Sequence, residues 1–307
     1  MSTTRKLPLK SFEQIHEIAQ SKGQRELVVA GAHSKEVIEA IIQSQALGLT
    51  FPHLVGDSEK IQQICSDRGI DITQWKIYDA KTDEAVATQA VSLIDQGVGC
   101  ILMKGQISTP ILLKKVLNPE YNLRTGNLLS HVALLNVPSY PKLLMISDSG
   151  MVTRPNLDEK VQILQNALNV FEILGVDQPK VAILAANEKV SDKLPETIDA
   201  VQLVEQARNG NFGNCIVEGP YALDIAFSPY AAKIKNIETQ IHGDPDLLLM
   251  PDVTSGNILA KGLVYLANAQ ICGLVVGARI PIILISRAEY AESWVRSIAF
   301  ASLICEK

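Results

Sequence analysis

The chain has 307 residues, 47% of them hydrophobic, and its 28 Lys plus Arg against 33 Asp plus Glu give a formal charge of −5. This length supplies enough apolar surface for two domains, and the acidic balance argues against nucleic acid as a partner. The polar N-terminus has no apolar signal-peptide run, and no segment approaches the roughly 18 apolar residues of a membrane span, so we expect a soluble, cytoplasmic protein that has no membrane partner.

Short apolar runs alternate with longer segments of helical periodicity, which is typical of parallel strands joined by crossover helices. The sequence therefore predicts an α/β fold with mainly parallel sheets. In chain order, strands are predicted at 27–30, 53–55, 100–103, 132–135, 143–146, 181–184, 214–217, 247–250 and 282–285. Helices are predicted at 34–47, 58–69, 82–96, 157–174, 195–209 and 256–270, with a last helix from about 289 to 304.

Start signals support two of these helices and mark the start of another. Ser34 and Ser58 can cap the helices that they begin, and Thr109-Pro110 places a hydroxyl before a proline at a first helical turn.

The segment 136–141, NVPSYP, has two prolines in four residues, which break both helices and strand ladders. We expect the chain to cross between domains there. The last helix has no further strand to serve, so it is expected to pack back on the first domain. The predicted domains are 1–138 plus 287–307 and 139–286.

The motifs of several site classes are missing. The chain has no GxxxxGK[ST] loop, no complete dinucleotide fingerprint after Gly97, no HExxH and no GxSxG. The five cysteines include no CxxC pair, so we expect reduced thiols, with a catalytic Cys100 as an alternative. Asp244, Asp246 and Asp252 could suggest a cation site, but they flank a predicted strand, where turn chemistry is the stronger interpretation.

Three loops share one design, in which a strand end is followed by glycine or hydroxyl residues and a helix start. They are 103–110, 251–257 and 286–289. Such loops can direct backbone N–H groups and a helix N-terminus at an anion, although plain capping explains any one of them. Ligands of open parallel sheets also collect at the carboxyl ends of strands. Together the loops favour a phosphate-bearing ligand.

Six segments, in order, resemble the phosphate acetyl/butyryltransferase family, with the closest resemblance to phosphate butyryltransferase. They are LMKGQISTPILLKKVL, NLRTGNLLSHVALLNVP, KLLMISDSGM, VEGPYALDIAFS, GDPDLLLMPDVTSGNIL and ARIPIILISRAE. The resemblance covers the chain from about residue 25 to its end. It implies a two-domain α/β fold of the isocitrate/isopropylmalate-dehydrogenase-like kind, with the active site in the interdomain cleft and at least a homodimer.

The implied reaction is reversible transfer of an acyl group between coenzyme A and inorganic phosphate. It proceeds without a metal, a prosthetic group or a covalent acyl-enzyme, and its partners are the small-molecule substrates. The resemblance assigns the family's Ser-Arg pair to Ser286 and Arg287, which would polarise the acyl carbonyl and bind phosphate.

The general base is less well defined. Acetyltransferase members of the family have an aspartate seven residues beyond that serine, but Ser293 occupies this position here. We predict Glu292 as the base, with Glu289 as the reserve, and an exposed Glu292–Arg296 pair as the alternative interpretation.

Further substrate-binding residues follow from family positions and from the loops. The residues that match family positions near the cleft are Thr109, Ser130, Gly256 and Asn257. Lys104 of the first loop is a further candidate. Arg124, in the segment LRTG, matches the butyryl-type pattern and is a second phosphate candidate.

Three other functions stay open at this point. One is a phosphate acetyltransferase, and another is a metal- and NAD-dependent decarboxylating dehydrogenase of the same fold. The last is a protein that binds CoA or an acyl phosphate without catalysis, because the predicted base position departs from the family.

Overall fold

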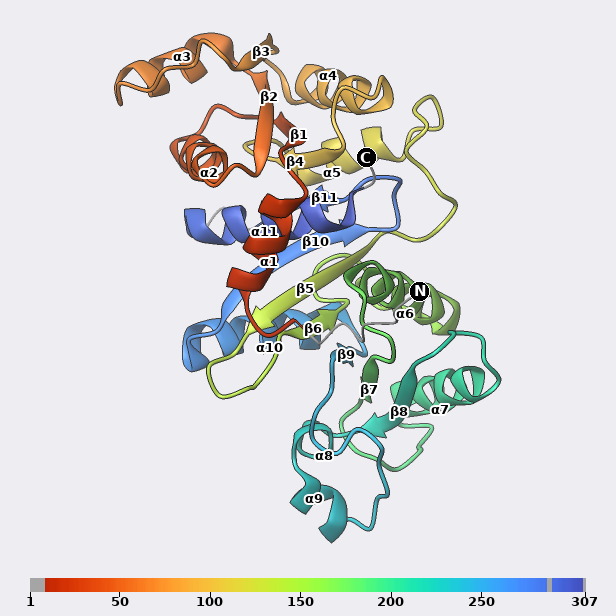
Figure 1. Ribbon diagram of the computed structural model, residues 1–307. Helices are drawn as coiled ribbons and strands as arrows, with labels where there is room; N and C mark the ends of the chain where they lie inside the picture. The colour runs from red at the N-terminus through yellow and green to blue at the C-terminus, as the bar shows by residue number, and fades with distance from the viewer. Residues whose placement is uncertain (1–8, 286–288, 306–307) are drawn as a thin grey trace, which may run out of the picture. The chain divides into compact units, whose positions relative to one another are not determined.

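The computed structural model describes residues 9–285 and 289–305 and has an α/β fold with mostly parallel strands (Figure 1). The chain divides into two compact units. Unit 1 contains residues through Ser11 together with Leu128–Ile271, and unit 2 contains Phe12–Asn127 together with the chain from Cys272 onward. Each unit is therefore assembled from two separate stretches of sequence.

The sheet of unit 2 has a parallel core. Its strands, in spatial order, are β3 (Lys76–Asp79), β2 (Thr50–Gly56), β1 (Arg25–Ala30), β4 (Ile101–Lys104), β11 (Ile282–Ile283) and β10 (Gln270–Val276). The first four strands and β11 run parallel, and β10 is antiparallel to β11. The short β11 comes from the end of the sequence but lies beside β4 (Figure 1). The apolar β1 and β4 are buried on both faces, as strands of a parallel sheet require.

Helices pack against this sheet in two groups. They are α1 (Phe12–Ser21), α2 (Lys35–Ala46), α3 (Ser58–Ser66), α4 (Asp83–Asp95), α5 (Thr109–Val116) and α11 (Ala291–Ile304). The last helix, α11, packs against both α1 and α2, while α4 packs against α5 and the strands β1, β2 and β4. Ten residues of α11 are buried, so this helix is a core element of unit 2.

Unit 1 has a sheet of five strands. In spatial order they are β5 (Ser130–Asn136), β6 (Leu144–Ser147), β9 (Leu247–Leu249), β7 (Lys180–Leu184) and β8 (Ile216–Tyr221). Only the β5–β6 pair is antiparallel. The helices of the unit are α6 (Leu157–Leu174), α7 (Pro195–Arg208), α8 (Leu223–Phe227), α9 (Pro229–Ile234) and α10 (Val253–Ala267).

The core of unit 1 joins one face of this sheet to its C-terminal helices. Alternate side chains of the strands, among them Leu135, Ile146 and Leu248, form one apolar cluster with Ile225 of α8 and Ala260 of α10. This alternation follows the period of two in β-strands. The cluster packs the middle of α10 against the sheet.

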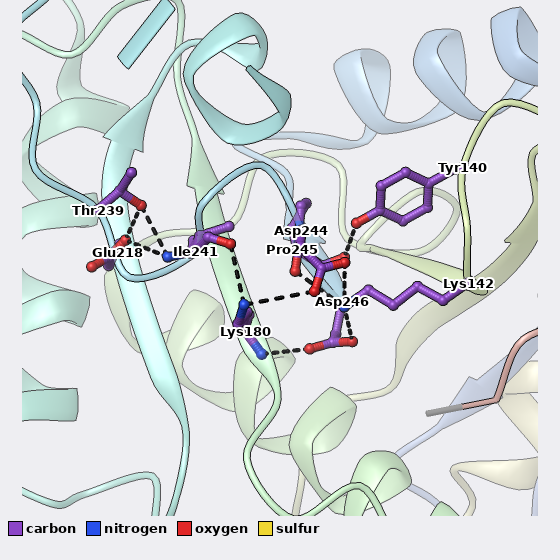
Figure 2. Close-up of polar contacts among 9 residues, drawn as sticks. All are labelled: Tyr140, Lys142, Lys180, Glu218, Thr239, Ile241, Asp244, Pro245 and Asp246. Atoms are coloured by element: carbon purple, nitrogen blue, oxygen red, sulfur yellow. Dashed lines mark hydrogen bonds and ion pairs between the residues drawn. The ribbon is translucent and has the colours of Figure 1, made fainter. Parts of the chain in front are cut away.

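A buried ion pair lies at the entrance to β9 (Figure 2). Lys142 Nζ is 2.5 Å from Asp246 Oδ1 and 3.1 Å from Asp244 Oδ1, and the side chains of Lys142 and Asp246 are only 8% and 10% exposed. The other oxygen of Asp246 accepts from the amide of Lys180 at 2.8 Å. These two aspartates pair with lysines of their own unit, which the sequence did not predict. No group of three His, Cys, Asp or Glu residues in the described chain is placed to hold a metal ion.

The approach to this ion pair is held by one residue of β8 and one residue of the β5–β6 loop. Glu218 of β8 accepts from Thr239 Oγ1 at 2.6 Å, and Tyr140 donates to the carbonyl of Pro245 at 2.6 Å (Figure 2). The chain from 239 to 246 is therefore fixed at both ends.

Several elements differ from the predictions. The segment 136–141 was predicted as a crossing between domains, but it connects β5 and β6, which are antiparallel neighbours within unit 1. Prolines stop strands at a hairpin loop as well as at a domain boundary. The strand predicted at 214–217 begins two residues later and runs to Tyr221, and the predicted strand 282–285 is regular only at 282–283. The predicted domain boundaries stay predictions.

Other differences concern helix ends. The predicted helix 256–270 begins earlier, at Val253, and ends at Ala267, because Asn268 adopts φ 54° and stops it. Ser34 caps α2 as predicted, whereas Asp57 instead of Ser58 caps α3. Ser108 occupies the cap position of α5 without a side-chain hydrogen bond, so the predicted hydroxyl cap at Thr109 is wrong.

The elements that the sequence did not predict are α1, α8, α9, β3 and β10. Among the residues that the structure describes, no helix is both long and apolar enough to span a bilayer.

Candidate active site

The two residues predicted with most weight, Ser286 and Arg287, lie outside the described residues. The described chain on either side ends at Ile285, two residues beyond β11, and resumes at Glu289, ahead of α11.

The two candidate bases lie at the start of α11. Glu292 is exposed in the first turn of the helix, where the helix N-terminus favours a negative charge. Glu289 Oε2 accepts from Ser293 Oγ at 3.3 Å. The side chain of Ser293 is buried and faces Glu289. Glu292 is thus the more accessible of the two carboxylates.

The alternative role of Glu292, an ion pair with Arg296, is not the arrangement in the structure. The guanidinium of Arg296 lies over the Phe12 ring, 5.6 Å from its centroid. Burial lowers the pKa of Arg296, against the opposing effect of Glu292 and Glu289 among others. No salt bridge joins Glu292 and Arg296, both of which the structure describes.

The first predicted loop does not present its amides to a ligand. The amides of Gly105, Gln106 and Ser108 already donate to Ala30 O at 2.8 Å, Gly31 O at 2.7 Å and Asp83 Oδ2 at 2.8 Å, respectively. The expectation of a backbone anion site is therefore wrong for these amides. Their partners come from the loop after β1 and from the start of α4, which hold the carboxyl ends of β1 and β4 together.

Two side chains of this loop are the predicted ligand contacts. Lys104 is the last residue of β4, is 5% exposed, and donates from Nζ to Gly105 O at 3.2 Å. Thr109 is the first residue of α5 and is half-buried.

Arg124 lies in a loop that is tied to the end of β10. It forms an isolated antiparallel bridge with Ala278, and its neighbour Thr125 donates from Oγ1 to Gly277 O at 2.5 Å. The side chain of Arg124 is exposed. A fixed backbone with a free side chain suits an arginine that binds an anion.

The predicted residues of unit 1 converge on one turn, residues 148–152, which follows β6. Gly256 in the first turn of α10 packs so closely against it that a Cβ would lie 2.4 Å from Asp148 O. Asn257 Nδ2 donates to Ser149 O at 3.4 Å. Glycine is thus required at 256 by the close approach of two backbones.

Ser130, the first residue of β5, has no exposed surface. Asn166 of α6 donates from Nδ2 to Ser130 Oγ at 2.9 Å and to Leu128 O at 2.8 Å. This arrangement fixes the strand that leads to His131.

Asp148 organises the turn through backbone hydrogen bonds. Its Oδ1 accepts from the amides of Gly150 at 2.7 Å and Met151 at 2.8 Å. Its Oδ2 accepts from the amides of His131 at 2.9 Å and Val152 at 3.3 Å. A carboxylate that is only 2% exposed thus satisfies four backbone donors, which makes the turn rigid.

His131 and Ser149 form a second contact across this turn. His131 Nδ1 and Ser149 Oγ lie 2.9 Å apart. Burial lowers the pKa of His131, against the opposing effect of Asp148, so its imidazole is neutral at pH 7. The ring also packs against Gly150, where a Cβ would lie 3.2 Å from His131 Cγ.

The second predicted loop, 251–257, is a capped helix start. Asp252 accepts from the amide of Ser255 at 2.8 Å, and the Ser255 hydroxyl donates to Asp252 O at 2.9 Å. Capping therefore explains the first turn of α10, and the side chains of Thr254 and Asn257 are exposed near the start of this helix.

Sequence reasoning did not assign a role to Asp148, Ser149 or His131. The available signal was Asp148-Ser149-Gly150, an Asp followed two residues later by Gly, which is a turn pattern. The four amide donors could not be foreseen because one of them, on His131, comes from a neighbouring strand.

Comparisons with known proteins agree with this arrangement of elements. The family model described as phosphate acetyl/butaryl transferase matches residues 84–302. The chain belongs to this family. Phosphate butyryltransferase from Clostridium acetobutylicum is 36% identical over 296 residues, which cover 96% of this chain and 98% of the relative. The predicted family is therefore confirmed.

Relatives that are named for different acyl groups resemble the chain to a similar degree. Phosphate acetyltransferase from Thermotoga maritima is 37% identical over 295 residues, covering 95% of this chain and 99% of the relative. A crystal structure of a branched-chain phosphotransacylase from Enterococcus faecalis V583 matches with a TM-score of 0.80 at 29% identity and covers 92% of this chain and 100% of that chain. Butyryl- and acetyl-type relatives are equally similar, so identity does not select an acyl chain.

Proposed function

We propose that the chain is a phosphate acyltransferase that reversibly transfers a short acyl group between coenzyme A and inorganic phosphate, giving an acyl phosphate. Membership of the family over residues 84–302, with acyltransferases aligned along nearly the whole chain, carries this proposal. It favours the acyltransferase over the dehydrogenase and over a binding protein without catalysis. Among acyl groups, butyryl is our first choice and acetyl the alternative.

In the proposed mechanism, the acyl group passes directly between the CoA sulfur and a phosphate oxygen without an acyl-enzyme. Arg287 binds phosphate through paired N–H donors, and Ser286 donates to the acyl carbonyl oxygen as negative charge develops there. Glu292 takes the proton of the CoA thiol in the direction of acyl-CoA formation. A base is useful because an unperturbed thiol has a pKa near 8.5 and is mostly protonated at pH 7.

The remaining predicted residues divide by accessibility. Arg124 and Asn257 have exposed side chains and are assigned contacts with phosphate groups of the substrates. Lys104 supplies an ammonium at the end of β4, and Thr109 supplies a hydroxyl at the start of α5.

Ser130 and Gly256 are buried, so we assign them a positioning role. Gly256 admits the turn at Asp148 close to α10, and Ser130 fixes the start of β5. Substrate contact then comes from their neighbours.

The proposal also includes expectations about the fold, the oligomeric state and the location of the protein. They are a two-domain fold of the isocitrate/isopropylmalate-dehydrogenase-like kind, a homodimer or larger homo-oligomer, and a cytoplasmic location. Coenzyme A and phosphate act as substrates, and no prosthetic group is proposed.

The test is thiol release from acyl-CoA. Acetyl-, propionyl-, butyryl- and isovaleryl-CoA are each incubated with the protein and phosphate, or with arsenate, whose acyl ester hydrolyses and drives the reaction forward. We expect phosphate-dependent CoA release that is fastest for butyryl or branched chains. CoA binding without thiol release would favour the binding protein, and metal-dependent NAD reduction would favour the dehydrogenase.

A further inference from the structure

Two cysteines that are 205 positions apart in the sequence meet in unit 2. Cys100 Sγ and Cys305 Sγ lie 3.4 Å apart, within sulfur hydrogen-bond distance. Cys100 directly precedes β4, and Cys305 follows the last residue of α11. The amides of both residues are fixed, to Glu26 O at 3.0 Å and Ala301 O at 2.9 Å. The contact therefore joins two well-anchored backbone positions.

The two thiols have unequal surroundings. Cys100 is half-buried, whereas Cys305 is only 7% exposed. The hydrogen bond between Cys100 and Cys305 and the charge of Arg25 lower the pKa of Cys100 to about 7, against the opposing effect of burial. The pKa of Cys305 is raised by the Cys100 thiolate and by burial. Cys100 is thus the more exposed and the more acidic of the two thiols, and Cys305 is the buried thiol beside it.

We propose that Cys100 and Cys305 form a reversible redox-modification site, at which a hydroperoxide oxidises Cys100 and Cys305 then closes an intramolecular disulfide. In the first step, the Cys100 thiolate attacks one oxygen of hydrogen peroxide, the O–O bond breaks, and Cys100 becomes a sulfenic acid as hydroxide leaves. In the second step, Cys305 attacks the Cys100 sulfur, the S–O bond breaks, and water leaves with the Cys305 proton. The two sulfurs close from 3.4 Å to the roughly 2.05 Å of a disulfide.

Reduction returns the site to its starting state. An external dithiol attacks the disulfide, forms a mixed disulfide, and leaves oxidised as both cysteines regain their protons. Reversibility separates this site from over-oxidation of a lone thiol, which ends in sulfinic or sulfonic acid.

Cys215 is a matched internal control. It is also half-buried, but its sulfur contacts only the carbonyls of Phe212 at 3.8 Å and Gly213 at 3.9 Å. Burial raises the pKa of Cys215 above its usual value. Its exposure is of the same class as that of Cys100, so a difference in reactivity reports the environment.

The sequence makes the site easy to read by peptide mass mapping. Each of the five cysteines falls on its own tryptic peptide, and those of Cys100 and Cys305 span 82–104 and 297–307. The full-length protein is treated with hydrogen peroxide, its free thiols are then alkylated, and the digest is compared with and without dithiothreitol. We expect a cross-link between 82–104 and 297–307 in a monomeric chain, loss of two of the five thiols, and full recovery on reduction.

Kinetics and variants test the two steps separately. Iodoacetamide at pH 7 should alkylate Cys100 at least about fivefold faster than Cys215, after allowing for the weaker nucleophilicity of the more acidic thiol. In Cys305→Ser, peroxide should leave a dimedone-reactive sulfenic acid on Cys100 and no cross-link, while Cys215→Ser should behave as the parent.

Three results would overturn the proposal: peroxide oxidising Cys215 before Cys100, a cross-link that joins two chains, or equal alkylation rates for the two thiols. The wild-type measurements decide the matter even if Cys305→Ser does not fold. None of these readouts uses catalysis, so they stand or fall independently of the acyltransferase activity.

Discussion

Replacing Gly256 by alanine tests whether the turn at Asp148 depends on its close approach to α10. The added Cβ would lie 2.4 Å from Asp148 O and 3.0 Å from Ser149 Cα, and both of these atoms belong to the backbone. The clash therefore cannot be relieved by a side-chain rotation, and the helix or the turn must move. Overpacking of this kind typically costs about 1–3 kcal/mol of unfolding free energy.

Gly262 on the same helix provides the control, because a Cβ there would meet no atom within 4 Å. Gly262→Ala should stabilise unit 1 by about 0.4–1 kcal/mol, since alanine restricts the unfolded chain and favours the helix. The two alanine variants differ only in position, so their comparison isolates the contact with the turn.

Urea unfolding with two probes measures both variants, and thiol release from butyryl-CoA measures activity. We expect Gly256→Ala to have the lower midpoint and at least tenfold lower activity, and Gly262→Ala to keep parental activity. If both variants were equally stable and equally active, the assigned packing of α10 against residues 148–149 would be refuted.

Three further predictions follow from other contacts. Lys142→Ala leaves the buried Asp246 without its cation and should lower the unfolding free energy by about 3–5 kcal/mol in a denaturant titration. Arg68→Ala removes one partner of the half-exposed Arg68–Glu39 pair and should lower it by only about 0–1 kcal/mol. The pKa of His131 is lowered in the folded state from 6.5, so below that pH the unfolded chain binds more protons and the free energy of unfolding falls as the pH falls. His131→Asn should reduce the slope of unfolding free energy against pH by up to about 1.4 kcal/mol per pH unit. An unchanged slope would contradict the assignment. Arg287→Ala should reduce kcat/KM by at least about a hundredfold with an unchanged circular dichroism spectrum, and near-parental turnover would remove Arg287 from the proposed mechanism.

The sequence predicted the parallel core because residues 27–30 of β1 and 101–103 of β4 are uninterrupted apolar runs, and such runs are buried on both faces of a parallel sheet. It did not predict β3, whose residues KIYD are short, polar at both ends and partly exposed at a sheet edge. The helical pattern also extended across Asn268 into β10, because local periodicity does not reveal a residue that adopts a left-handed conformation.

The candidate site was predictable only in part. The predictions of Ser286, Arg287 and Gly256 followed from local segments that resemble a family, whereas Glu292 was predicted because Ser293 departs from the family pattern. The hydrogen bonds of Asp148 and the meeting of Cys100 with Cys305 arise from tertiary packing between distant segments, which leaves no signal in local spacing. The amides of residues 105–108 show the opposite error, since a loop of suitable composition had already used its donors internally.

The place of β11 in its sheet has a consequence for synthesis on the ribosome. Residues 282–283 pair with β4 on one side and β10 on the other, so the middle of the unit 2 sheet is completed by residues that are translated after all the strands of unit 1. Residues 128–271 emerge after β4 but before β11, and they contain all the strands of the unit 1 sheet. We therefore expect unit 1 to fold while the chain is still attached and β4 to wait with an unpaired edge, the stage at which the nascent protein most needs protection from aggregation.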